Sequence, residues 1–233
     1  MRLVVLTTDT PCHAQFVADT MHMHRDSTHV IWEKERPLAP WWAEHELDRH
    51  RDQYEKERFG LDQRVLGVGC DVENVNGRVG LITRMRPDVV IVYGTGKLSP
   101  EVIATCPQMF NLHGADAEMY RGLDGAYWAI YWGDFDAIAV TLHRVEPTLD
   151  TGEIVSKRKI PLRPGMGVHE LRAEAALLCN EMVADLLDDI EHGRLKTRPQ
   201  RGRKARYFSF MPACLKSHVE RKFKEHVNGM ATD

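Results

Sequence analysis

The chain has 233 residues, with 31 lysines and arginines against 34 acidic residues, so its formal charge is −3. This length suits one α/β core with a small appendage, and the charge balance excludes a global attraction to nucleic acid or an anionic membrane. The five cysteines are widely spread without a C-x-x-C pair, which favours reduced thiols in the cytoplasm over disulfides or structural zinc. No apolar run approaches the roughly 18 residues of a membrane span, so no membrane partner is expected.

The first half of the chain alternates short apolar runs with segments of helical character. Apolar runs bounded by turn residues predict strands buried on both faces, and Ser99-Pro100 has the chemistry of a helix start. We expect strands at 3–6, 29–33, 88–93 and 109–113, and helices at 13–22, 75–85 and 99–105. This alternation predicts an α/β fold with a doubly wound, mostly parallel sheet.

The second half is predicted to add an antiparallel pair and a long helix. After a short helix at 125–131, the runs 138–145 and 154–162 have strand character. A helix over 168–190, stopped by Gly193, is expected to cover the sheet. The composition then turns basic and aromatic. We therefore divide the chain into a catalytic domain, 1–193, and a small C-terminal extension, 194–233.

Residues 44–58 are an insertion between predicted core elements. Ten of these fifteen residues are charged, and Trp41, Trp42 and Phe59 bracket the segment. One interpretation is a solvated amphipathic helix. The other is a lid or dimer arm whose aromatic side chains cover a substrate.

Asn111, His113 and Asp150 carry the chemistry that the sequence predicts. Asn111 and His113 are two residues apart on an expected strand, so their side chains share one face. An amide can donate to an oxyanion, and an imidazole can move a proton near neutral pH. Asp150, on a later loop, can orient the imidazole or take the proton that is finally released. The combination predicts acyl transfer without a side-chain nucleophile.

Five separated motifs occur in the order and spacing of a known family. They are Asn111-Leu112-His113, Tyr120-Arg121-Gly122, Gly133-Asp134, Thr141-Leu142-His143 and Leu149-Asp150-Thr151-Gly152. Over roughly 86–163 the chain resembles the catalytic half of the folate-dependent formyltransferases. The resemblance implies that a primary amine attacks the formyl group of N10-formyltetrahydrofolate directly, with no metal.

The same resemblance implies a role for each catalytic residue. Asn111 would stabilise the oxyanion, an interaction typically worth about 3–4 kcal/mol of barrier. His113 would stabilise the same oxyanion or relay the amine proton. Asp150 would orient His113 or hold the water through which that proton leaves, and which of His113 and Asp150 is the formal base stays open.

Folate is expected between the loop after the strand at 88–93 and the loop that carries Asp150. The residues implied in cofactor binding are Tyr93, Gly94, Thr95, Gly96, Lys97, Leu98, His143, Val145 and Gly152. His143 matches a family position near the folate, although a core or loop histidine is an alternative. Gly94-Thr95-Gly96 lacks the third glycine of a dinucleotide fingerprint, which argues against a Rossmann cofactor.

The expected acceptor is a nucleotide-linked amino deoxysugar. Residues 7–11 are not a Gly-Ser-rich phosphate loop, which disfavours glycinamide ribonucleotide. The forty residues after Gly193 are fewer than an RNA-gripping barrel needs, which disfavours methionyl-tRNA. Pro199-Gln200 and Arg206-Tyr207-Phe208 resemble the ends of short nucleotide-sugar N-formyltransferases. The substrate-binding residues expected on this basis are Thr10, Tyr120, Arg121, Arg206 and Tyr207.

Other functions remain open at this level. The acceptor could be another small amine, such as an amino acid or hydroxylamine. The unusual run 115–119 also allows a folate-binding or protein-binding module without turnover. The basic cluster at 196–206 is either a solvated face or a site for a diphosphate. The resemblance favours a homodimer, with Phe208, Phe210 and Met211 as its apolar anchors.

Overall fold

The computed structural model describes residues 1–24, 27–35, 39–60, 67–201 and 205–230. A seven-stranded sheet with the order β3-β2-β1-β4-β5-β7-β8 forms its centre. The strands are β1 (Leu3–Thr7), β2 (Thr28–Glu33), β3 (Cys70–Val72), β4 (Val89–Tyr93), β5 (Met109–His113), β7 (Ala139–Arg144) and β8 (Ile154–Lys159). β1 to β5 are parallel, whereas β7 is antiparallel to both β5 and β8. The doubly wound, mostly parallel sheet is confirmed, and β3 is an addition that the sequence did not predict.

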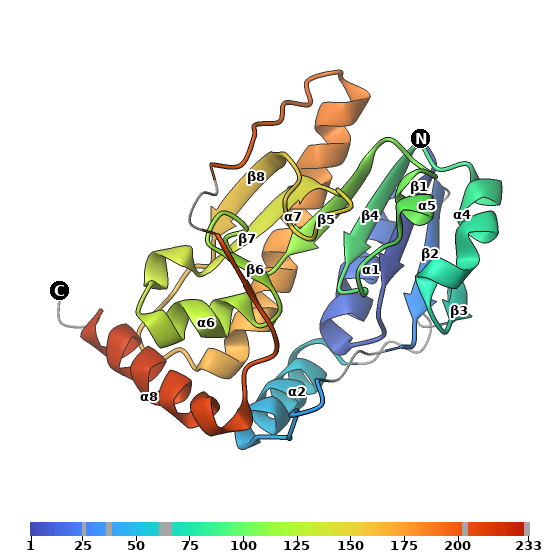
Figure 1. The fold of residues 1–233 in the computed structure, drawn as a ribbon. Coiled ribbons are helices and arrows are strands. Elements are labelled where there is room, and N and C mark those ends of the chain that lie inside the picture. Colours follow the sequence, from blue (N-terminus) through green and yellow to red (C-terminus); the bar gives the residue numbers. More distant parts are fainter. Residues whose placement is uncertain (25–26, 36–38, 61–66, 202–204, 231–233) are drawn as a thin grey trace.

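The apolar strands are buried on both faces because helices cover the sheet on both sides (Figure 1). The helices are α1 (Pro11–His24), α2 (Glu46–Phe59), α4 (Val79–Met85), α5 (Pro100–Ile103), α6 (Gly125–Trp132), α7 (Leu171–Glu191) and α8 (Ala213–Gly229), with 3-10 turns η2 (Val75–Arg78), η3 (Phe135–Ala137) and η4 (Val168–Glu170). Leu3 and Val5 of β1 pack into the core beneath α1 and α7. Val4 and Leu6 pack into a second core beneath α4 and α5. This alternation follows from the two-residue period of strand side chains.

The order of the strands places a crevice between β1 and β4. From β1 the chain moves outward to β2 and β3, then returns to β4 on the other side of β1. In such sheets ligands bind at the carboxyl ends of the strands, where the direction of winding reverses. The residues that follow β1 and β4 are therefore the first place to look for a site.

Helix α2 is largely exposed, as expected of a solvated amphipathic helix over 44–58, and its buried face is held by ion pairs. Glu55 is fully buried and accepts a hydrogen bond from the guanidinium of Arg172 on α7, with 2.7 Å between Oε2 and Nη2. Asp48 is 5% exposed and lies 2.7 Å (Oδ1) from Nζ of Lys216 on α8. Buried charges of this kind are tolerated only when paired, so α2 is fixed against two other helices.

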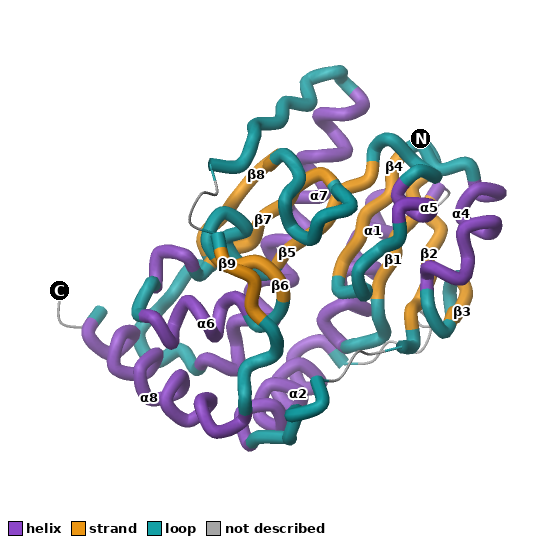
Figure 2. Tube along the Cα trace, in the orientation of Figure 1, coloured by secondary structure: helices purple, strands orange, loops and turns teal. Residues whose placement is uncertain are grey.

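The C-terminal extension packs onto the rest of the chain. Strand β9 (Arg206–Phe208) pairs in parallel with β6 (Tyr120–Gly122) in a separate two-stranded sheet (Figure 2). Helix α8, which the sequence did not predict, lies along α6 and buries Val219, Phe223 and Val227 in the core that α1 and α7 share. The boundary at 193/194 stays a prediction, but residues on both sides of it share this core.

The predicted dimer anchors are used within the chain. Phe208 stacks between Tyr120 and Trp128, with ring centroids 5.4 and 5.1 Å apart. Met211 is 2% exposed. Both side chains thus have partners within the chain, and their role as dimer anchors stays a prediction. Among the described residues, no helix has the length and apolar character needed to cross a membrane.

Candidate active site

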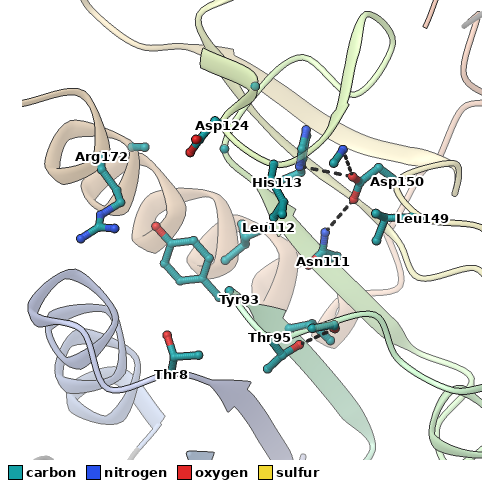
Figure 3. A pocket seen from close by; sticks show the side chains of 18 of the residues that line it. Thr8, Tyr93, Thr95, Asn111, Leu112, His113, Asp124, Leu149, Asp150 and Arg172 are labelled. Atoms are coloured by element: carbon teal, nitrogen blue, oxygen red, sulfur yellow. Dashed lines mark hydrogen bonds and ion pairs between the residues drawn. The ribbon is translucent and has the colours of Figure 1, made fainter. Parts of the chain in front are cut away.

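A cavity of about 620 Å³ opens at the carboxyl ends of β1, β4 and β5 (Figure 3). Its walls come from the residues after β1, the loop 94–98, the end of β5 and the loop before Asp150. This volume falls within the range of small-molecule sites, roughly 300–1,000 Å³. In Figure 3 Asn111 and His113 point toward Asp150 on one side of the cavity, and Arg172 lies on the other side beyond Tyr93.

Three side chains meet around the carboxylate of Asp150. Asn111 Nδ2 lies 3.4 Å from Asp150 Oδ1 and 3.1 Å from Nε2 of His143. His113 Nδ1 lies 3.6 Å from Asp150 Oδ2, and His143 Nε2 lies 3.5 Å from Oδ1. The two side chains of β5 therefore share one face, as their spacing predicted.

The partners of the two histidines assign opposite tautomers. His113 Nε2 is 2.7 Å from the Tyr120 carbonyl oxygen, which can only accept, so this nitrogen carries the proton. By the same reasoning His143 carries its proton on Nδ1, 2.7 Å from the Arg144 carbonyl. His143 Nε2 is then free to accept from the Asn111 amide. His113 presents Nδ1 to the Asp150 carboxylate.

Asp150 is buried and ionised. Burial would raise the pKa of its carboxyl, but the neighbouring His113 and His143 and the hydrogen bond from the Gly122 N–H outweigh burial and lower that pKa below its usual value. The Gly122 N–H donates to Oδ2 at 2.8 Å. A Cβ on Gly122, which has a φ of 88°, would collide with the Phe208 carbonyl. The glycine of the Tyr120-Arg121-Gly122 motif thus lets β9 pass close while its amide holds Asp150.

Most residues expected at the folate line the cavity. Tyr93 to Leu98, His143 and Val145 all do so, whereas Gly152 does not. A Cβ on Gly152 would collide with the Arg144 carbonyl, so this glycine is required by the close approach of the Arg144 backbone. The binding roles of these residues stay predictions.

Of the residues expected at the acceptor, Thr10 lines the cavity, whereas Tyr120, Arg121, Arg206 and Tyr207 belong to the β6–β9 pair outside its lining. Burial and the neighbouring Asp134 raise the pKa of the Tyr120 hydroxyl to about 12. The four side chains of the β6–β9 pair thus lie outside the cavity lining, and their roles in substrate binding stay predictions.

The basic cluster is partly neutralised within the chain. Arg198 donates from Nη1 and Nη2 to the carboxylate of Glu118 at 2.9 and 2.8 Å, and this pair holds the pKa of Glu118 well below its usual range. Arg203 and Lys204 lie outside the described residues. The diphosphate interpretation of this cluster stays untested.

Several cavity residues were not predicted from the sequence. They are His13, Arg51, Asp124, Tyr127, Phe210 and Arg172. His13 closes one end, where its Nδ1 lies 2.5 Å from the Thr8 hydroxyl and its ring lies against Tyr93. Arg51 reaches the cavity from the insertion α2, a contribution that no local motif indicates. Within the part of the chain that the structure describes, no group of three His, Cys, Asp or Glu side chains is arranged so that it could hold a metal ion.

A doubly wound sheet with a cavity at its carboxyl edge, lined by Asn111, His113 and Asp150, is the arrangement that the sequence predicts for an acyl-transfer enzyme. A sequence model described as formyl transferase matches residues 1–184. The chain therefore belongs to the formyl transferase family.

Curated relatives match this chain over part of their length. Methionyl-tRNA formyltransferase of Caldanaerobacter subterraneus subsp. tengcongensis is 29% identical over 128 residues, which are 54% of this chain and 41% of that protein. The methionyl-tRNA formyltransferase of a Synechococcus species is 32% identical over 122 residues, or 52% of this chain and 38% of that protein. The chain thus spans about two fifths of the length of these relatives.

Solved structures share the fold over most of this chain. An N-formyltransferase from Helicobacter canadensis, in complex with folinic acid and dTDP-3-aminofucose, has a TM-score of 0.61 at 14% identity, covering 90% of this chain and 71% of that one. A 4-N formyltransferase from Francisella tularensis has a TM-score of 0.63 at 12% identity, covering 90% and 76%. At such identities the likeness establishes the fold alone.

Proposed function

We propose that this chain transfers a formyl group from N10-formyltetrahydrofolate to the amino group of a nucleotide-linked amino deoxysugar. The observation that carries the transfer chemistry is the meeting of Asn111, His113 and Asp150 at one wall of the cavity. The loop 94–98 and Val145 line the same cavity, and exposed loop amides and carbonyls suit the hydrogen-bonding edge of a pterin. The residues present therefore fit a folate.

The formyl donor would supply an electrophilic carbon, and Asn111 would stabilise the negative charge that develops on its oxygen. Both protons of Asn111 Nδ2 now face acceptors, His143 Nε2 at 3.1 Å and Asp150 Oδ1 at 3.4 Å. The hydrogen bond to Asp150 is the longer and weaker of the two, so the formyl oxygen of the substrate would take the place of Asp150 Oδ1 as acceptor. The bond to His143 would hold the amide in place, which is the preorganisation that oxyanion stabilisation requires.

His113 and Asp150 would move the proton that the amine loses when it attacks. His113 Nδ1 carries a lone pair in its assigned tautomer, because its proton is fixed on Nε2 by the Tyr120 carbonyl. The ionised Asp150, 3.6 Å from Nδ1, would stabilise the imidazolium that forms when His113 accepts a proton. This arrangement favours His113 as the base and Asp150 as its partner.

The sugar acceptor is supported by the solved neighbours. The H. canadensis structure holds folinic acid and dTDP-3-aminofucose together on the same fold. A second candidate is methionyl-tRNA, which is supported by the curated relatives at 29–32% identity. The net charge of −3 gives no general attraction to RNA, so the sugar remains the first choice.

The test is a panel of acceptors incubated with N10-formyltetrahydrofolate. The panel contains dTDP-linked and UDP-linked 3-amino and 4-amino deoxysugars, free amino acids, hydroxylamine and methionyl-tRNA, and mass spectrometry identifies the formamide. We expect product with a nucleotide-linked sugar. Formylation of methionyl-tRNA alone would favour the second candidate, and no product with any amine would exclude the transfer.

A further inference from the structure

Three backbone carbonyl groups of the loop that carries Asp150 accept hydrogen bonds from the C-terminal extension. The Gln200 amide nitrogen donates to the Asp150 carbonyl at 2.9 Å and to the Gly152 carbonyl at 2.8 Å. The Tyr207 hydroxyl donates to the Leu149 carbonyl at 2.8 Å. The main chain is therefore held at Asp150 itself and on both sides of it.

Arg121 determines which way the Gln200 amide points. Its Nη2 lies 2.8 Å from Gln200 Oε1, and a guanidinium has protons to donate but no lone pair to accept with. The carbonyl side of the amide must face Arg121, so both protons of Nε2 are available to the loop. A glutamate at this position would keep the contact with Arg121 but would turn a second oxygen lone pair toward two carbonyl oxygens.

The pairing of β6 with β9 brings these residues together. Arg121 and Tyr207 are register partners, and the Arg121 guanidinium lies 5.8 Å from the centre of the Tyr207 ring. Just before Gln200, Arg198 exchanges two backbone hydrogen bonds with Ile154, of 2.8 and 2.9 Å. The segment that holds the loop is thus itself fixed at both ends.

The loop needs such support because Asp150 has a φ of 54°. A left-handed conformation is unfavourable for a residue that carries a Cβ, and surrounding contacts must maintain it. The Gly122 N–H, from the same β6, holds the Asp150 carboxylate at 2.8 Å. Gly122 of β6 therefore holds the side chain of Asp150, and Gln200 holds its main chain.

We propose that Gln200 is a positioning residue for catalysis, oriented by Arg121 and assisted by Tyr207, and that it keeps Asp150 at His113 and Asn111. This proposal rests on the proposed function of the Asp150 site. It gives Arg121 and Tyr207 a role in supporting the site and requires no contact between these two residues and the acceptor.

The test compares Gln200→Glu with Tyr207→Phe, which removes one hydroxyl but keeps the ring beneath Arg121. In formyl transfer to the sugar acceptor that the panel identifies, we expect Gln200→Glu to lower kcat about tenfold or more while KM changes less than about threefold. Tyr207→Phe should lower kcat by a smaller factor. The control is Gln53→Glu, the same change on the exposed surface of α2, which should leave both constants unchanged.

Amide hydrogen exchange tests the same proposal without any substrate. The amide protons of Gly122 and Ile154 are held by the Asp150 carboxylate and by the Arg198 carbonyl. Gln200→Glu should raise exchange at these two amides more than about tenfold, with little change in the central strands. Exchange and kcat within twofold of wild type would overturn the proposal. So would a rise spread evenly over the protein, because it would show a general loss of stability.

The two proposals fail in distinguishable ways. A wild-type protein that formylates no acceptor would refute the proposed function, and the exchange measurement would still decide whether Gln200 holds the loop. Active wild-type protein with an unaffected Gln200→Glu variant would refute only the positioning role.

Discussion

The buried carboxylate of Glu33 accepts a hydrogen bond from the backbone N–H of Gly96, with 2.8 Å between Oε2 and the nitrogen. Its other oxygen accepts from the Val75 N–H at 3.0 Å, and the residue is 2% exposed at the end of β2. Asn76 holds the same loop through the Lys97 carbonyl at 3.0 Å and the Ser99 N–H at 2.7 Å. The loop on which folate is expected is therefore shaped by side chains that do not line the cavity.

Replacing Glu33 by glutamine should weaken folate binding. Glutamine offers an oxygen to only one of the two N–H groups and turns its own NH₂ toward the other, so one buried donor loses its partner. We expect folinic acid to bind about tenfold more weakly, measured by titration calorimetry, a loss that corresponds to about 1.4 kcal/mol. The exposed Glu73→Gln on the neighbouring loop is the control and should bind as wild type does. Equal affinity of Glu33→Gln would mean that folate does not contact this loop.

Asn111→Ala should remove most of the turnover. Loss of a single preorganised oxyanion donor typically lowers kcat by about 100-fold to 1,000-fold. Because the effect falls on the transition state, the affinity for folinic acid should change little, and a kinetic assay beside a calorimetric titration separates the two. Asn228→Ala, at an exposed position near the end of α8, is the control. Near-native kcat in the Asn111 variant would assign the oxyanion contact to another group.

Features that depend on a local residue pattern, such as buried strands and side chains on one strand face, were predicted correctly from the sequence. The apolar runs that became β1, β4 and β5 are buried on both faces, and a spacing of two residues was enough to bring Asn111 and His113 onto one face of β5. Helix α8 was missed because Val219, Phe223 and Val227, each four residues apart, are set in a strongly charged segment.

Pairings between distant residues could not be predicted. Glu55 and Asp48 are buried only because Arg172 and Lys216 reach them from helices more than 100 positions later. Gln200 meets Asp150 because β9 pairs with β6, across more than 80 residues of intervening chain. In such cases the pattern of one segment does not indicate which distant segment it will contact.

Asp150 should contribute stability that depends on pH. Its pKa in the folded protein lies below the ordinary value of 3.8, so near that pH the unfolded chain binds more protons than the folded one. The contribution is fully present well above 3.8 and is lost as the pH falls through the folded pKa. We expect the difference in Tm between wild type and Asp150→Asn to be largest near pH 7 and to shrink toward about pH 3. A difference that stays constant over this range would show that the carboxylate is not stabilised by its neighbours.

Lys216→Met should destabilise the fold. The Lys216 ammonium lies 2.7 and 2.5 Å from the two oxygens of Asp48, and both side chains are less than a tenth exposed. Its removal leaves a buried carboxylate with fewer partners, which typically costs about 3–5 kcal/mol. We expect the lower end of this range in urea denaturation, because Arg51 still contacts Asp48 at 3.1 Å. Lys224→Met, on the exposed side of α8, should stay within about 0.5 kcal/mol of wild type. Equal stability of the two variants would show that α8 is not held to α2 by this pair.

Gly94→Ala should damage both the fold and the site. Gly94 has a φ of 83°, and a Cβ there would collide with the ring of His13. We expect a loss of about 1–3 kcal/mol in urea denaturation from the backbone alone, together with loss of folinic acid binding as the loop moves. The double variant Gly94→Ala, His13→Ala removes the collision but not the backbone strain, and should recover only part of the stability.

Gly80→Ala is the matched control, because this helical glycine has room for a Cβ, 3.7 Å from the Arg84 side chain. It should stabilise α4 by about 0.5–1 kcal/mol. Native stability and native folate affinity in Gly94→Ala would show that the loop adapts freely and that His13 does not define this end of the cavity.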